Sequence, residues 1–165
     1  DELIGRVIYA YRDSYSGGSV SSRIGWIWLS PPADWGEADF EENLIHEYVH
    51  NVLFLEEMVH TLFTQPADVM ALPDNQILSA IRRVPRFFDQ SYHAAAVAIV
   101  LAEAAAREGR LNVTQSLIEG TLVSLDGLMK RTDLVTTNGQ ALLEDMVDVC
   151  LLLAAQFDEL YHTAA

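Results

Sequence analysis

His46, Glu47 and His50 form the string HEYVH, which is the HExxH pattern. On a helix, residues four apart lie one turn apart on the same face, so both imidazoles can bind one metal ion. Glu47 then stands beside the metal's open coordination position. A chain of this length shows the pattern by chance in about one case in 200. The string predicts a metal site, and the alternative is a pair of histidines that bind no metal.

The predicted helix around this string is apolar on the side of the histidines, where Ile45, Val49, Leu53 and Phe54 recur at helical spacing. Two histidines buried among such side chains without a ligand would lack partners for their ring nitrogens. The apolar surroundings therefore favour the metal-site interpretation.

The residues that follow His50 do not supply a third ligand. The metzincin pattern HExxHxxGxxH is broken, because Leu53 and Glu56 stand where that pattern has Gly and His. Glu57 and His60 share a helical face with His50, but they lie about 10 and 15 Å further along the axis. The third ligand must come from another segment of the chain.

His93 is the predicted third ligand, because it opens an apolar helix that must pack inside the protein. Asp89, one turn earlier on the same face, is the carboxylate alternative. By itself His93 would be interpreted as a core histidine bonded to a backbone carbonyl. The HExxH pair elsewhere in the chain favours the ligand interpretation.

Three of the ten basic residues, Arg82, Arg83 and Arg86, cluster shortly before His93. In so acidic a chain, such a cluster can hold the carboxylate of a co-substrate beside a metal. The alternative is a set of ion pairs with nearby acidic residues. Both interpretations stay open.

The elements that must position these side chains are mostly helices. Asp39 is predicted to cap the first long helix, whose first turn is acidic. Pro85 marks a boundary, and Gly109 ends an Ala-rich helix. The predicted strands cover 3–11 and 25–29, and the predicted helices cover 40–63, 76–83, 87–108, 112–130 and 138–162. The expected fold is a mainly α, single helical domain over 1–165, with four to five helices and a small N-terminal β element.

Composition limits the partners. With 24 Asp plus Glu against 10 Lys plus Arg, the formal charge of −14 would repel nucleic acid and anionic membrane surfaces. The longest apolar run, 94–106, is too short to span a membrane, and no signal peptide is predicted. The single cysteine, Cys150, excludes an intramolecular disulfide and fits a reducing cytoplasm. We therefore expect a cytoplasmic protein that acts on a small molecule or a basic peptide.

The order of these features resembles the HExxH-motif proteins found beside bacterial pathways to ribosomally made peptide natural products. Some of these proteins are described as 2-oxoglutarate-dependent peptide β-hydroxylases. The resemblance runs from about Gly25 to Met146, and HEYVH is its one sharp motif. The other similar strings are GWIWLS, LIHEYVHNVLF, the VPR step, SYHAAAVAIVLAEA and LDGLMKRTDLVTTNGQALLEDM.

Carried over to this sequence, the resemblance implies a metal pair at His46 and His50, a distal histidine at His93, and an arginine-containing step at Arg83 to Arg86. The implied metal is Fe(II), whose open positions take 2-oxoglutarate and dioxygen. The implied reaction is hydroxylation of a β-carbon in a peptide substrate, with or without a leader segment. Glu47 would then orient a ligand or hold a water molecule. The sequence leaves the oligomeric state open.

Two other functions compete with this one. In a zinc metallohydrolase, Glu47 would be the general base that deprotonates a zinc-bound water, and Glu103 is a weak candidate for the third ligand. In a catalytically inactive peptide-binding domain, the acidic surface would attract a basic leader peptide.

Overall fold

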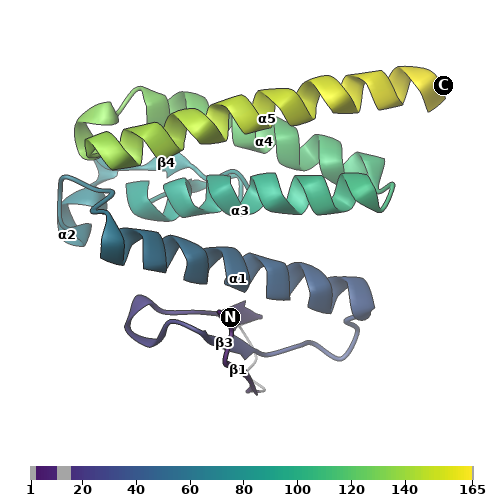
Figure 1. Cartoon of the computed structure of the whole chain (residues 1–165), viewed down its shortest axis with the longest axis horizontal. Helices are drawn as coiled ribbons and strands as arrows, with labels where there is room; N and C mark the ends of the chain where they lie inside the picture. Colours follow the sequence, from purple (N-terminus) through teal and green to yellow (C-terminus); the bar gives the residue numbers. More distant parts are fainter. Residues whose placement is uncertain (1–2, 11–15, 165) are drawn as a thin grey trace. The chain divides into compact units, whose positions relative to one another are not determined.

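The computed structural model describes residues 3–10 and 16–164, with side chains described as far as residue 159. Within these residues the fold is mainly α, with five α-helices and a small N-terminal sheet, which confirms the predicted class. None of the helices in this described part is long and apolar enough to cross a membrane. The chain divides into two compact units, Asp1–His60 and Thr61–Ala165, and each is described by itself (Figure 1).

The first unit contains a three-stranded sheet. Its strands are β1 (Arg6–Tyr9), β2 (Gly17–Gly18) and β3 (Trp26–Leu29), in the order β1-β3-β2. β3 pairs parallel with β1 and antiparallel with β2. The two predicted strands are confirmed within the described residues, although each is short, and residue 11 lies outside them. β2 lies between the two predicted strands, where the sequence predicts no strand.

The two faces of β3 differ in burial, as expected from the alternation of side chains along a strand. Ile27 and Leu29 are buried, whereas Trp26 and Trp28 are half-buried. The guanidinium carbons of Arg6 and Arg23 lie 4.8 and 5.0 Å from the Trp26 ring centroid, which is cation–π geometry. The sheet lies alongside the first long helix (Figure 1).

That helix is α1 (Glu37–Val59), which carries the HEYVH string. Asp39 does not cap it as predicted: Gly36 is the N-cap, and the backbone N–H of Gly36 donates to Asp39 Oδ2 at 2.8 Å. The Asp39 carboxylate therefore stabilises the start of the helix from the third helical position, where it accepts the N–H of the N-cap residue. The helix also ends four residues earlier than predicted, and its C-cap His60 is extended.

The early end of the helix has a tertiary cause in the second unit. Phe63 forms an isolated β-bridge with Val135, and the N–H of Thr64 donates to Leu134 O at 3.0 Å. The segment that follows α1 thus obtains its backbone partners from a distant part of the chain. Local helical pattern cannot reveal such pairing.

The second unit is built on three long helices, α3 (Phe88–Arg107), α4 (Leu111–Met129) and α5 (Thr137–Ala164), preceded by the short α2 (Ala67–Met70). The long helices run side by side (Figure 1). Their predicted bounds are confirmed to within one or two residues. Small side chains on α3 allow close packing, and the buried ones are Ala94, Ala95, Ala98, Ala102 and Ala105.

The predicted helix over 76–83 is wrong. The segment forms a hairpin of β4 (Ile77–Leu78) and β5 (Pro85–Arg86). Arg83, in the turn, has φ 56°, and its guanidinium donates to the Ser116 carbonyl on α4. Contact with α4 therefore holds the turn in a left-handed conformation that interrupts any helix.

Candidate metal centre

His46 and His50 lie together on α1, with 3.2 Å between their Nε2 atoms. Their ring centroids are 4.9 Å apart. Two nitrogen ligands at 2.0–2.1 Å from one tetrahedral metal are about 3.3 Å apart. The separation is that of a hydrogen bond between the two rings, and it also matches the spacing of two nitrogen ligands on a single ion.

Of the four apolar residues predicted beside the pair, Val49, Leu53 and Phe54 lie on its side of α1, whereas Ile45 lines a separate pocket. Val49 and Leu53, on the same side of α1, are buried. The Phe54 ring stacks on His50 with centroids 6.1 Å apart and an interplanar angle of 21°. Such walls lower the local dielectric and restrict the rotation of the imidazole rings, which favours a fixed ligand geometry.

Glu47 is buried between α1 and the sheet, with 5% of its surface exposed. The Ser19 hydroxyl donates to Glu47 Oε2 at 2.8 Å. Burial raises the pKa of Glu47, and the hydrogen bond from Ser19 opposes part of that rise. The carboxyl group is thus held by the sheet segment rather than open to solvent.

Asn51 connects the same helix to the sheet. Its Nδ2 donates to the Glu47 carbonyl at 2.8 Å, and its Oδ1 accepts the Gly25 N–H at 2.7 Å. Gly25 has φ +84°, and a Cβ there would lie 2.8 Å from Leu3 O. The turn before β3 therefore requires glycine in order to present its N–H to Asn51.

Sequence reasoning missed Ser19 and Asn51. For Asn51 a signal existed, because a polar residue four positions after Glu47 falls on the same side of the helix. Ser19 carries no comparable signal, since it stands in a polar segment of several serines and glycines.

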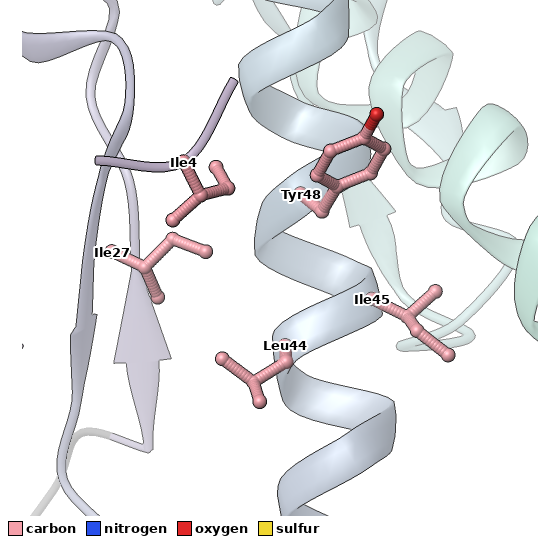
Figure 2. A pocket seen from close by; sticks show the side chains of 5 residues that line it. All are labelled: Ile4, Ile27, Leu44, Ile45 and Tyr48. Atoms are coloured by element: carbon pink, nitrogen blue, oxygen red, sulfur yellow. The ribbon is translucent and has the colours of Figure 1, made fainter. Parts of the chain in front are cut away.

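A small apolar pocket of about 270 Å³ opens elsewhere on α1, lined by Ile4, Ile27, Leu44, Ile45 and Tyr48. Figure 2 shows Leu44 and Ile27 on facing elements and the Tyr48 hydroxyl pointing away from the aliphatic side chains. At 100° per residue, Tyr48 lies about 160° around the helix from His50. The pocket is therefore separate from the histidine pair, and Ile45 lines it.

His93 and Asp89 stand one turn apart on α3, in the second unit. His93 is buried, and its ring stacks on Phe63 with centroids 6.4 Å apart. Asp89 Oδ1 is buried and has no hydrogen-bond partner among the described residues. A buried carboxylate oxygen is costly unless it meets a donor or a cation. The neighbouring Arg86 is a cation that interacts electrostatically with Asp89.

The three arginines before His93 differ in their surroundings. The Arg83 guanidinium is committed to the Ser116 carbonyl, and Arg82 is exposed. Arg86 is half-buried, and its Nε donates to Gln90 Oε1 at 3.1 Å. Burial and the charge of Arg82 lower the pKa of Arg86, whereas Asp89 raises it. Arg86 is the partly desolvated cation of the three.

The structure brings the His46 and His50 rings together in the first unit and bonds the Glu47 carboxyl group to Ser19. Arg86, Asp89 and His93 lie along one segment of the second unit. A third ligand from His93 stays a prediction, since each unit is described by itself. Over residues 3–10 and 16–159, no group of three or more His, Cys, Asp or Glu side chains is arranged to hold a metal ion.

Comparisons with protein-family models and with curated protein sequences give no match. The function must therefore be argued from the site residues and from their geometry.

Proposed function

We propose that the protein is a non-haem Fe(II)- and 2-oxoglutarate-dependent hydroxylase that acts on a β-carbon of a ribosomally made peptide. His46 and His50 would hold the metal, with His93 or Asp89 as the third ligand. The observation that carries the proposal is the 3.2 Å separation of the two Nε2 atoms. Iron held by two histidines and one further ligand supplies open coordination positions for a co-substrate and dioxygen.

The environment of Glu47 favours a hydroxylase over a hydrolase. A general base must reach a water molecule at the metal. Glu47 Oε2 instead accepts a hydrogen bond from Ser19, and the carboxyl group is buried against the sheet. Such a group is suited to orienting its neighbours on α1, which is the role that an iron oxygenase requires of it.

Arg86 is the best supported of the three arginines for binding the 2-oxoglutarate carboxylate. A half-buried guanidinium binds a carboxylate more strongly than an exposed one, because solvent screens it less. Arg83 has weaker support, since the Ser116 carbonyl occupies its guanidinium. Arg82 would contribute through its charge.

Zinc-dependent hydrolysis is the second candidate, and one observation favours it. Burial raises the pKa of Glu47, and a carboxylate with a raised pKa is a better general base near neutral pH. Under this alternative, Glu47→Gln would abolish hydrolysis while leaving the metal bound.

The test is an anaerobic titration of the metal-free chain with Fe(II) and then 2-oxoglutarate, beside a parallel titration with Zn(II). The proposal predicts a weak visible charge-transfer band that His46→Ala and His50→Ala abolish. His60→Ala is the matched control, because His60 is an exposed histidine at the end of the same helix. It should leave the band unchanged.

The other outcomes select between the alternatives. Tight stoichiometric binding of Zn(II) without the band, together with a hydrolytic activity that Glu47→Gln removes, would replace the hydroxylase with the hydrolase. Binding of neither metal would overturn both, and would leave the peptide-binding domain.

A further inference from the structure

The segments that flank the small sheet of the first unit bond to α1 at two points. The Ser19 hydroxyl donates to Glu47 Oε2 at 2.8 Å, and the Gly25 N–H donates to Asn51 Oδ1 at 2.7 Å. These two bonds link residues that are 28 and 26 positions apart in the chain. Ser19 therefore holds the Glu47 carboxyl group, whereas Asn51 bonds the Glu47 carbonyl from the same helix.

Glycine at position 17 allows this arrangement. A Cβ there would lie 3.1 Å from Leu29 Cδ2, 3.2 Å from the Trp28 carbonyl and 3.7 Å from Glu47 Oε1. A larger residue would require Leu29 or the Trp28 carbonyl to shift by a few tenths of an ångström. The short strand β2 thus packs closely on β3 directly before Ser19.

The hydrogen bond removes conformational freedom from Glu47. A glutamate side chain has three rotatable bonds, and a buried carboxyl group without a donor costs free energy. With Oε2 bound by Ser19, one orientation of the carboxyl group is favoured.

We propose that Ser19 is a positioning residue of the candidate metal centre and that it acts through Glu47. The inference rests on the proposed function only in requiring a metal at His46 and His50. Groups that orient the surroundings of a metal change its affinity by about 10- to 100-fold when they are removed. Ser19 should therefore influence the metal although it is not a ligand.

The experiment uses Co(II) as the probe, because its visible absorption reports the geometry around the ion. Ser19→Ala should weaken Co(II) binding by about 10-fold and shift the absorption bands. Ser19→Thr retains a hydroxyl group and should restore both properties toward those of the parent protein. The matched control is Ser21→Ala, which removes an exposed serine from the same connection and should change neither property.

A double-mutant cycle tests whether Ser19 acts through Glu47. The second background is Glu47→Met, which fills a similar volume without a carboxyl group. In that background, Ser19→Ala should produce no further change in affinity or spectrum. Thermal unfolding of each variant checks that the fold is retained, and if Glu47→Met does not fold, comparison of Ser19→Ala with Ser19→Thr decides.

Four results would overturn the inference in distinguishable ways. An unchanged Co(II) spectrum and affinity in Ser19→Ala would remove the positioning role, and so would a failure of Ser19→Thr to restore them. An equal effect of Ser19→Ala in both backgrounds would remove Glu47 as the intermediary. Failure of the parent chain to bind Co(II) would overturn the proposed metal site itself.

Discussion

The two helices that carry the chemically informative residues, α1 and α3, bury different kinds of side chain. On α1, two of the four buried residues are polar, Glu47 and Asn51, and both are hydrogen-bonded to other groups. On α3 most of the twelve buried residues are apolar. Its buried Tyr92 hydroxyl donates to the Gly139 carbonyl at 2.8 Å.

The buried polar residues of α1 and the buried apolar residues of α3 therefore have different effects, the first on the orientation of side chains and the second on the free energy of folding. Hydrogen bonds are directional, so they fix how α1 presents Glu47 and the adjacent histidines. Apolar burial is non-directional and contributes most of the free energy of folding. We therefore expect changes in the α3 core to affect stability, and changes around Glu47 to affect the geometry of the site.

The largest effect is expected in the core of the second unit. Phe88 is fully buried at the start of α3, and Phe88→Ala should lower the free energy of unfolding by about 3–5 kcal/mol. Phe87→Ala is the matched control, because this neighbouring phenylalanine is 39% exposed. Urea denaturation measures both variants, and equal losses would contradict the assignment of the core.

The next largest effect is expected on metal affinity, and it tests whether a residue of the second unit is the third ligand of the candidate metal centre. His93→Ala should weaken metal binding by about 100-fold or more if His93 is the third ligand, and Asp89→Asn should do so if Asp89 is. Isothermal titration with Zn(II) measures both. Equally tight, stoichiometric binding in both variants would show that the third ligand lies elsewhere, and His60→Ala again serves as the control.

Asn51→Ala should lower the free energy of unfolding by about 2 kcal/mol, because it leaves the buried Gly25 N–H without its acceptor. Asn43→Ala is a close control on the same helix. Asn43 Nδ2 also donates to the carbonyl four residues earlier, Asp39 O, but in an exposed position. Its loss should be below about 0.5 kcal/mol. Similar losses in the two variants would remove the structural role of Asn51.

The smallest effect is electrostatic. The Arg131 guanidinium donates to Asp133, at 3.1 Å from Nε to Oδ1, and this bond lowers the pKa of Asp133. Since the pKa is lower in the folded state, the pair stabilises the fold above the ordinary aspartate pKa, and this contribution is lost as pH falls through the lowered pKa. Because the carboxylate is exposed, the contribution should stay below about 1 kcal/mol.

Asp133→Asn should therefore reduce the free energy of unfolding slightly at pH 7 and not at all in strong acid. Added salt at neutral pH should diminish the difference, because it screens exposed charges. A difference that persists unchanged in acid would contradict an electrostatic origin.

Much of the second unit was predictable from sequence, because its signals are local. Apolar spacing and the Ala-rich run predicted α3 and α4, and Gly109, at φ +73°, ends α3 as expected. The hairpin around Arg83 was not predictable, since its conformation depends on a contact with Ser116, 33 positions away.

The sequence by itself determined that His46 and His50 lie side by side, because residues four apart on any α-helix converge on one face. Only the tertiary structure decided that Ser19 bonds the Glu47 carboxyl group and that Asn51 accepts the Gly25 N–H, because these bonds join the helix to an earlier part of the chain. A hydrogen bond needs both partners at the right distance and angle. Between residues four apart on one helix, the helix itself sets this distance and angle. Between residues far apart in the sequence, only the folded chain brings the two partners into place.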